Sequence, residues 1–198
     1  MPLESEVIKK QLRSSIIKKR NILTPRQVDE KSAQIMDRLL SLDEYHQARS
    51  VMVYLDFRGE VRTAGLVKQA LADGKNVAAP LTDIAKGLLT PALIVDFPAD
   101  LRPGAWGILE PGPQARLLDP ATLDLVITPG VAFDLSGYRI GYGCGFYDRF
   151  LPRTGKDTVY IGLAYEFQIQ PDVFPQVHDV PVDIILTEER VIRVMKCA

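Results

Sequence analysis

Residues 50–79 read SVMVYLDFRGEVRTAGLVKQALADGKNVAA, which is two short apolar segments with a helix-length segment between them. Residues 50–55 have the length and composition of a buried strand, and residues 76–79 have the same character. Between them, Thr63 is placed to cap a helix that ends at Asp73-Gly74. Strand, helix and strand in this order predict a parallel pair joined by a right-handed crossover. The stretch therefore indicates an α/β fold.

The rest of the chain extends this pattern in both directions. Residues 4–20, and a segment that opens at Thr24-Pro25 and runs to Leu40, are predicted to be helices. Further strands are expected at residues 88–90, 92–95, 123–128, 158–163, 182–186 and 191–195. Because no repeat or linker divides the chain, we expect a single domain over residues 1–198 with a mostly parallel sheet.

The composition disfavours several classes of protein. Apolar residues make up 46% and charged residues 25% of the 198 residues, as in an ordinary soluble protein. A net charge of −1 gives no overall attraction to nucleic acid or to an anionic membrane, so neither partner is expected. No apolar run approaches the length of a membrane span, and Glu4 and Glu6 stand where a signal peptide would be apolar. We therefore expect a cytoplasmic location.

The two cysteines, Cys144 and Cys197, are too few for a disulfide framework or a metal-binding set. Cys144 lies in a glycine-rich segment, where a reactive thiol is conceivable. A catalytic thiol needs an activating neighbour, however, and neither His46 nor His178 is placed by the sequence to provide one. The pattern therefore disfavours a thiol mechanism.

Residues 137–151, GYRIGYGCGFYDRFL, form what we call the glycine segment. Its glycines allow the backbone to approach a ligand closely, and the residues that follow them resemble a helix start, so that backbone N–H groups could hold an anion. Arg139 and Arg149 add positive charge, whereas Asp148 would repel a polyanion unless Mg²⁺ lay between them. The segment therefore indicates a magnesium–nucleotide site, or alternatively a surface turn in which Asp148 caps a helix.

Three other features allow a functional and a structural interpretation. Lys9 and Arg13 are four residues apart and share a helix face, which is either a solvated basic face or an anion site. Glu60 follows a strand at the sheet edge where ligands gather, but it could equally be a solvated turn residue. Trp106, the single tryptophan, is either a core plug or a stacking surface for a planar ligand.

The chain resembles the 5-formyltetrahydrofolate cyclo-ligase family over nearly its whole length. The longest matching run extends from Pro129 through the glycine segment to Leu151, and it is specific to that family. Cys144 stands where the family often has glycine, and Phe146 stands where tyrosine is also common. Shorter matching segments are residues 9–13, Tyr54-Leu55, Glu60-Val61, Thr63, Gly74-Lys75, Pro80, Gly107-Ile108, Glu110-Pro111, residues 165–168, residues 178–183 and Thr187-Glu188.

The resemblance implies conversion of 5-formyltetrahydrofolate to 5,10-methenyltetrahydrofolate, with ATP as co-substrate, Mg²⁺ as cofactor and ADP and phosphate as products. It assigns Mg²⁺ to Asp148 and Asp183 and reaction roles to Glu60, Arg139 and Tyr147. The implied ATP-binding residues are Lys9, Arg13, Arg139, Gly141, Gly143, Cys144, Gly145, Phe146 and Tyr147. The implied folate-binding residues are Arg13, Leu55, Glu60, Trp106, Tyr142, Gly143, Cys144, Gly145 and Phe146.

The implied fold is a three-layer αβα sandwich with a Rossmann-like, mostly parallel sheet, and we expect the protein to act on these small molecules as a monomer. Two other functions remain open at this point. A folate- or nucleotide-binding protein without catalysis would show the same pattern. A dinucleotide-dependent oxidoreductase would also use a Gly-x-Gly-x-Gly turn, but it would place that turn after the first strand rather than late in the chain.

Overall fold

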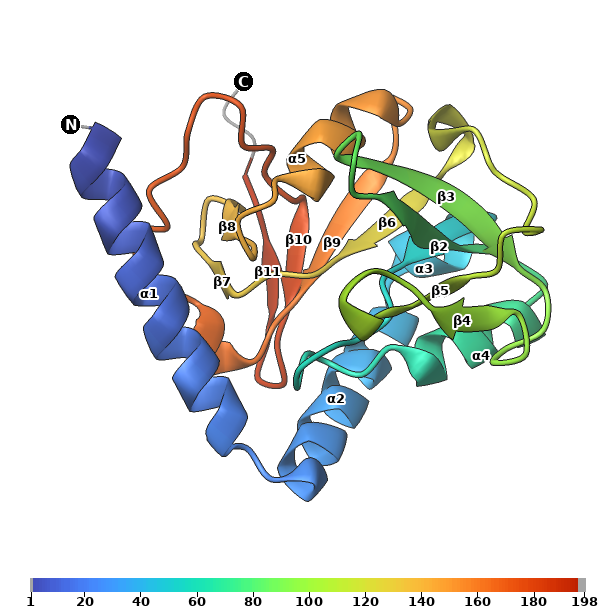
Figure 1. Ribbon diagram of the computed structural model, residues 1–198. Helices are drawn as coiled ribbons and strands as arrows, with labels where there is room; N and C mark the ends of the chain where they lie inside the picture. Colours follow the sequence, from blue (N-terminus) through green and yellow to red (C-terminus); the bar gives the residue numbers. More distant parts are fainter. Residues whose placement is uncertain (1, 196–198) are drawn as a thin grey trace.

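The computed structural model describes residues 2–195, and a seven-stranded sheet runs through that part of the chain (Figure 1). Its strands are β1 (Ser50–Val53), β2 (Asn76–Asp83), β3 (Leu88–Ile94), β6 (Leu125–Thr128), β9 (Val159–Leu163), β10 (Ile184–Leu186) and β11 (Val191–Arg193). They lie in the order β11-β10-β9-β6-β1-β2-β3. Pairing is parallel from β10 to β2 and antiparallel at both edges, which confirms the predicted α/β class with a mostly parallel sheet.

The predicted strand–helix–strand unit is present at the centre of the sheet. Helix α4 (Ala64–Ala72) connects β1 to β2, and these strands pair in parallel with Val51 opposite Val77. The backbone turns after α4 at Gly74, which has a positive φ of 75°. Thr63 stands at the N-cap position, but its hydroxyl donates to the carbonyl of Tyr54 at 2.7 Å instead of capping the helix. The unit was therefore predicted correctly, whereas the role of Thr63 was not.

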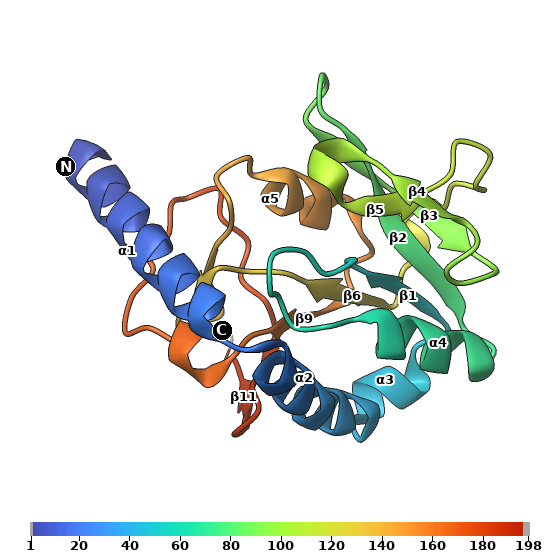
Figure 2. The same ribbon diagram turned by 60° about the horizontal axis from the view of Figure 1, so that its bottom comes forward.

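One face of the sheet is covered by α2 (Pro25–Leu40), α3 (Asp43–Gln47) and α4, which Figure 2 shows side by side. Helix α2 begins at Thr24, whose side chain accepts a hydrogen bond from the Gln27 backbone, as the Thr-Pro start predicts. Ile35 and Leu39 of α2 are fully buried and belong to the same core cluster as Val51 and Val53 of β1. Helix α2 is therefore held by burial of its apolar stripe.

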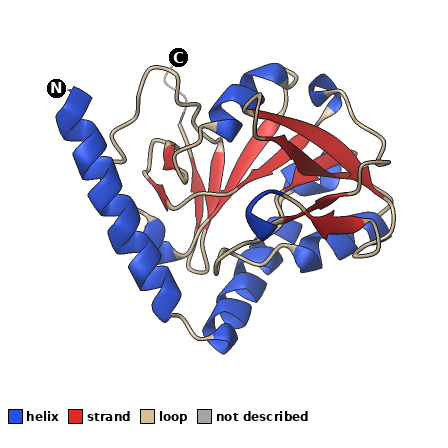
Figure 3. Cartoon of the chain, viewed as in Figure 1, coloured by secondary structure: helices blue, strands red, loops and turns tan. Residues whose placement is uncertain are grey.

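The opposite face carries a thinner layer. Helix α5 (Phe146–Phe150) and the 3₁₀ turn η3 (Leu151–Arg153) pack Phe150 and Leu151 onto Met52 and Val126 of the sheet. Helix α1 (Pro2–Ile22) packs Ile16 against a small hairpin made of β7 (Ala132–Phe133) and β8 (Arg139–Ile140). Helical layers on both faces confirm the predicted αβα sandwich, as the colouring by secondary structure shows in Figure 3.

Other short elements were not predicted from the sequence. Strands β4 (Leu101–Pro103) and β5 (Leu109–Pro111) form a second hairpin, with the 3₁₀ turn η1 (Ala105–Gly107) between them. The remaining 3₁₀ turns are η2 (Pro120–Thr122) and η4 (Glu166–Gln168). Strands this short contain too few residues to show an alternating pattern of apolar side chains.

The two short strands expected at residues 88–90 and 92–95 are one continuous strand, β3. Pro91 made the sequence pattern look interrupted, but β3 lies at the sheet edge and pairs along its length with β2. A proline is tolerated in an edge strand because the missing N–H can face away from the sheet. Cys197 lies outside the described residues. Among residues 2–195, no helix is both long and apolar enough to cross a membrane.

Candidate active site

A cavity of about 390 Å³ opens at the carboxyl ends of β1 and β6. These two strands are neighbours, but the chain proceeds from β1 towards one edge of the sheet and from β6 towards the other. Ligands of open α/β sheets bind at such a switch point, beyond the carboxyl ends of the strands. Tyr54 and Leu55 after β1, and Pro129 and Gly130 after β6, line the cavity.

The floor of the cavity is the glycine segment. Gly143 and Gly145 adopt positive φ values of 103° and 62°, conformations that glycine takes without steric cost. Arg149, which the sequence suggested as an anion ligand, instead donates to the carbonyl oxygens of Gly87 at 2.9 Å and Cys144 at 2.8 Å. Arg149 therefore fastens the glycine segment to the turn between β2 and β3.

Arg139 and Asp148 form an ion pair within the same floor. The Arg139 Nη2 donates to Asp148 Oδ1 at 2.8 Å, and Nη1 donates to the carbonyl of Val180 at 2.6 Å. The Arg139 side chain is only 3% exposed, and burial lowers its pKa while Asp148 opposes that shift. Asp148 is not the N-cap of α5, since Gly145 occupies that position, so the predicted helix-cap alternative for Asp148 is wrong.

Helix α1 contacts the glycine segment from the side. Arg13 Nε donates to the carbonyl of Gly141 at 2.8 Å, which ties the helix to the segment. Lys9 Nζ lies 3.3 Å from Asp179 Oδ2, so this lysine is paired with a carboxylate and partly buried. Neither basic residue is part of the cavity wall, although Arg13 contacts Gly141, which lines it.

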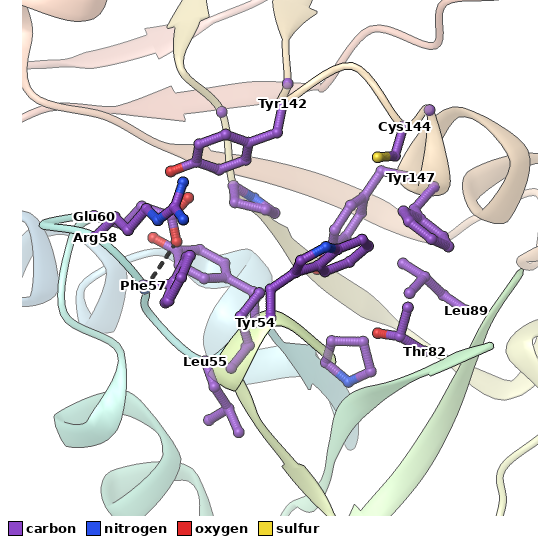
Figure 4. A pocket seen from close by; sticks show the side chains of 18 of the residues that line it. Tyr54, Leu55, Phe57, Arg58, Glu60, Thr82, Leu89, Tyr142, Cys144 and Tyr147 are labelled. Carbon is purple, nitrogen blue, oxygen red and sulfur yellow. Dashed lines mark hydrogen bonds between the residues drawn. The ribbon is translucent and has the colours of Figure 1, made fainter. Parts of the chain in front are cut away.

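Glu60 lines the cavity beside Tyr142 of the glycine segment, and it is buried rather than solvated. Its Oε2 accepts a hydrogen bond from the Phe57 backbone at 3.0 Å, the dashed contact in Figure 4. Figure 4 also shows the Tyr142 ring above Glu60, on the opposite side of the cavity from Leu55. Burial raises the pKa of Glu60 to about 7, although Arg20, Phe57 and Tyr142 all act to lower it.

A mainly apolar wall closes the other side. Trp106 of η1 is 54% exposed, so the core-plug interpretation is wrong. Its ring centroid lies 6.0 Å from that of Phe146 in an edge-to-face arrangement, which places an aromatic pair at the cavity. Leu89 and Ile108 add aliphatic surface beside them. This wall can contact the face of a planar, largely apolar ligand.

Buried polar atoms without partners lie around the cavity. Among the described residues, the hydroxyl of Tyr147 is buried without a hydrogen-bond partner, although the Tyr147 ring lines the cavity. Burial raises the pKa of Tyr147, so its hydroxyl stays protonated near neutral pH and can donate a hydrogen bond. A buried donor without a partner is costly, which is consistent with a ligand atom as its acceptor.

Most of the predicted site residues meet in this one cavity. Those that line it are Leu55, Glu60, Trp106, Arg139, Gly141, Tyr142, Cys144, Gly145, Phe146, Tyr147 and Asp148. The predicted residues that are not in its wall are Lys9, Arg13, Gly143 and Asp183. Among the described residues, no group of three or more His, Cys, Asp or Glu side chains is arranged to hold a metal ion.

Asp183 directly precedes β10, and its Oδ2 accepts the backbone N–H of Tyr160 at 2.8 Å. Two further residues reach the site through the fold alone, without a signal in the sequence. Glu110 of β5 is buried and lines the cavity, whereas Arg20 of α1 lies just behind the wall. Glu110 belonged to a matching segment without an assigned role, and Arg20 stood in a run of basic residues that gave no sign of burial.

The fold and the cavity define an α/β protein with a glycine-rich segment and an apolar wall at one switch point. A profile of the 5-formyltetrahydrofolate cyclo-ligase family matches residues 5–188. The 5-formyltetrahydrofolate cyclo-ligase of Haemophilus influenzae is 36% identical over 183 residues, which cover 90% of this chain and 96% of that protein. The corresponding Escherichia coli protein is 33% identical and covers 89% of this chain, with 98% of its own length matched.

Solved structures agree with these sequence matches. The NMR structure of 5,10-methenyltetrahydrofolate synthetase from Aquifex aeolicus superposes with a TM-score of 0.85 at 32% identity. The match covers 96% of this chain and 95% of that one. The chain therefore belongs to the 5-formyltetrahydrofolate cyclo-ligase family, and the protein is a ligase of folate metabolism.

Proposed function

We propose that the protein closes the ring of 5-formyltetrahydrofolate to give 5,10-methenyltetrahydrofolate, with ATP converted to ADP and phosphate. The observation that carries the proposal is that the glycine segment and Glu60 line one cavity, so that phosphates and a folate could lie in contact there. Family membership supports a folate substrate, and the glycine-rich backbone along the cavity, with positive φ at Gly143 and Gly145, supports a nucleotide beside it.

The chemistry explains why a phosphoryl donor is needed. The formyl oxygen of the substrate is an amide oxygen, which does not leave when N10 attacks the formyl carbon. Transfer of the γ-phosphoryl group of ATP to this oxygen releases ADP and makes the oxygen part of a leaving phosphate. N10 then adds to the carbon and gives up its proton, and the C–O bond breaks as phosphate departs. A transfer of this kind depends on positioning and charge neutralisation rather than on a protein nucleophile.

In this proposal the glycine segment and α1 hold ATP. The bare backbone of Gly141, Gly143 and Gly145 allows phosphate oxygens to approach N–H groups. Arg139 adds positive charge from beneath the floor, while Arg13 reaches the same segment through Gly141. Cys144 and Phe146 would contact both ligands from the tip of the segment. Lys9 would contribute after exchanging part of its contact with Asp179 for a phosphate.

Mg²⁺ fits the same end of the cavity. Both hydrogen bonds described for the Asp148 carboxylate are made by Oδ1, with Arg139 and the Val180 backbone, which leaves Oδ2 for a metal. Proteins commonly hold Mg²⁺ by one or two carboxylates together with substrate phosphates, so a single wall carboxylate is sufficient. Bound there, Mg²⁺ would neutralise phosphate charge. Asp183, the second predicted ligand, is retained only as an expectation because it does not line the cavity.

The folate would occupy the side formed by Leu55, Glu60, Tyr142 and the apolar wall. An ionised Glu60 accepts hydrogen bonds, which suits the ring N–H and amino group of a pterin. Trp106 would lie against the pterin or aminobenzoate ring. Tyr147, whose hydroxyl lacks a protein partner, would donate to a substrate oxygen near the reacting atoms.

A direct assay tests the proposal. The purified protein is mixed with Mg-ATP and 5-formyltetrahydrofolate, and the absorbance of methenyltetrahydrofolate is followed together with ADP release. We expect product only when ATP is present, with one ADP formed per methenyl group. Tight binding of both ligands without product would instead identify a binding protein, and the proposal would be rejected.

A further inference from the structure

Arg20, the last arginine of α1, is buried in an unusual way. Its side chain is 1% exposed, and its Nη2 donates to the hydroxyl of Tyr142. Its Nη1 lies 4.0 Å from Glu60 Oε1, close enough for an ion pair but too far for a hydrogen bond. Among the described residues, Nε and Nη1 have no hydrogen-bond partner. A buried guanidinium with unused donors is costly, so packing alone is a poor explanation for its position.

The contacts of Arg20 differ from those of an arginine that fastens elements together. Arg149, for comparison, directs its nitrogens to the backbone carbonyls of Gly87 and Cys144. Arg20 instead directs its guanidinium at two side chains of the cavity wall, Tyr142 and Glu60. Those two residues come from different parts of the chain and meet at the side proposed to hold the folate.

Arg20 is the cation that faces Glu60 among the groups acting on that carboxylate. Arg20 lowers the pKa of Glu60, and so does Tyr142 of the glycine segment. Asp56, in the loop that carries Glu60, raises it. Burial raises the pKa of Tyr54 and Tyr147, and the charge of Glu60 adds to the shift of both. The Tyr165 hydroxyl, beyond β9, donates to the Glu60 backbone carbonyl at 3.2 Å.

The geometry points to Arg20 as a positioning residue for folate binding, because its guanidinium favours the ionised form of the buried Glu60 carboxylate and holds Tyr142 beside it. This inference rests on the proposed function. Arg20 balances the charge of Glu60 from 4.0 Å without a hydrogen bond to it, while the Tyr142 hydroxyl, which accepts from Arg20, is hydrogen-bonded to the carboxylate. A carboxylate can accept more hydrogen bonds than those from Phe57 and Tyr142, so lone pairs of Glu60 remain for donors of the substrate. Arg20 itself need not touch the substrate.

Removal of the guanidinium should therefore act through Glu60. Burial raises the pKa of Glu60, and the charge of Arg20 is the largest effect that lowers it. Without Arg20 the pKa of Glu60 would therefore be higher, and the carboxylate would take up a proton at higher pH. In Arg20→Met we expect the midpoint of folate binding to move up by about one pH unit, and binding at pH 7 to weaken about tenfold. Affinity for ATP should not change in this variant. Weaker ATP binding would show instead that the substitution had displaced α1, which carries Arg13.

The experiment measures the dissociation constant of 5-formyltetrahydrofolate by calorimetry from pH 5.5 to 8.5. It compares the unmodified protein with Arg20→Met, Arg20→Lys, Glu60→Gln and the double variant Arg20→Met/Glu60→Gln, together with ATP binding by each. Arg26→Met is the matched control, since Arg26 is an exposed arginine that forms a surface ion pair with Glu30. Arg20→Lys keeps a charge and should shift the profile less than Arg20→Met; it also serves if Arg20→Met does not fold.

The inference predicts that Arg20→Met has no further effect on the pH profile when Glu60 is already glutamine. An unshifted profile in both Arg20 variants would overturn it, as would an equal loss of binding in the presence and absence of the Glu60 carboxylate. In either case the unmodified protein would still bind folate and form product, so the proposed function would stand. Failure of the unmodified protein to bind folate would reject both.

Discussion

The two sides of the cavity hold their charges in different ways. On the floor, Arg139 and Asp148 are joined at 2.8 Å, and Arg139 is also bonded to the Val180 carbonyl. On the folate side, Glu60 has a backbone donor at 3.0 Å but its nearest cation, Arg20, is 4.0 Å away. The floor therefore carries a preformed ion pair. The wall at Glu60 instead carries a carboxylate whose protonation changes near neutral pH.

This difference indicates how the two ligands would be recognised. In the proposed function, a polyanion would meet the glycine-rich backbone and a buried ion pair, so its binding should depend on position and metal rather than on pH. A pterin would meet an ionisable acceptor and aromatic surface, so its binding should follow the charge of Glu60. The following substitutions separate the two sides, from the largest expected effect to the smallest.

Asp148→Asn should have the largest effect. Loss of the carboxylate would weaken metal binding at the phosphate end, and we expect turnover to fall on the order of 100-fold. The amide oxygen can still accept from Arg139, so the protein should fold, which circular dichroism would check. Asp183→Asn is the matched comparison, because Asp183 was predicted alongside Asp148 but lies outside the cavity wall. Near-normal turnover of Asp148→Asn at limiting Mg²⁺ would contradict a metal role.

Glu60→Gln should affect the folate side alone. We expect kcat/KM for 5-formyltetrahydrofolate to fall about tenfold at pH 8, because a carboxylate that accepts two substrate donors is replaced by an amide that accepts fewer. In the unmodified protein, kcat/KM should rise with pH through about 7 as Glu60 ionises, and this rise should be absent in Glu60→Gln. A rise that persists in the variant would assign the titration to another group.

Glu60 should also make the unliganded protein less stable at higher pH. Its pKa is raised from 4.5 to about 7 on folding, so its unfavourable effect is absent below 4.5 and grows until the pH passes about 7. The difference corresponds to at most about 3 kcal/mol. Urea unfolding from pH 4.5 to 8 should show Glu60→Gln gaining stability relative to the unmodified protein as pH rises. A constant difference across this range would show that Glu60 does not titrate as proposed.

Arg13→Ala and Lys9→Ala should each raise the KM for ATP several-fold, in keeping with loss of one charge-assisted contact of about 1 kcal/mol. The KM for folate should change little. Lys18→Ala is the control, since Lys18 is an exposed basic residue of the same helix. An ATP dependence like that of the control would leave Lys9 and Arg13 with only their structural contacts, to Asp179 and Gly141.

Trp106 should give the smallest kinetic effect and a direct optical signal. Because it is the only tryptophan, its fluorescence reports on this wall, and we expect quenching when folate is added. Trp106→Phe retains an aromatic face and should raise the folate KM about threefold. Fluorescence that stays constant at saturating folate would exclude a contact between the ligand and Trp106.

Much of the architecture was predictable because its signals are local. A few neighbouring residues are enough to predict the apolar strand at 50–53, the helix that follows it and the turn at Gly74. The parallel sheet then follows from the handedness of the crossover. The β7–β8 and β4–β5 hairpins escaped prediction because their strands span only two or three residues.

The sequence by itself determined the α/β class, the family resemblance and the glycine segment, since each depends on residue types at short spacings. Only the tertiary structure decided what surrounds each charge. It buried Glu60, paired Asp148 with Arg139, used Arg149 to fasten a loop, and brought Arg20 from α1 to the cavity wall. Burial and pairing arise between residues far apart in the chain, where spacing carries no information, and they set the protonation state on which the folate side depends.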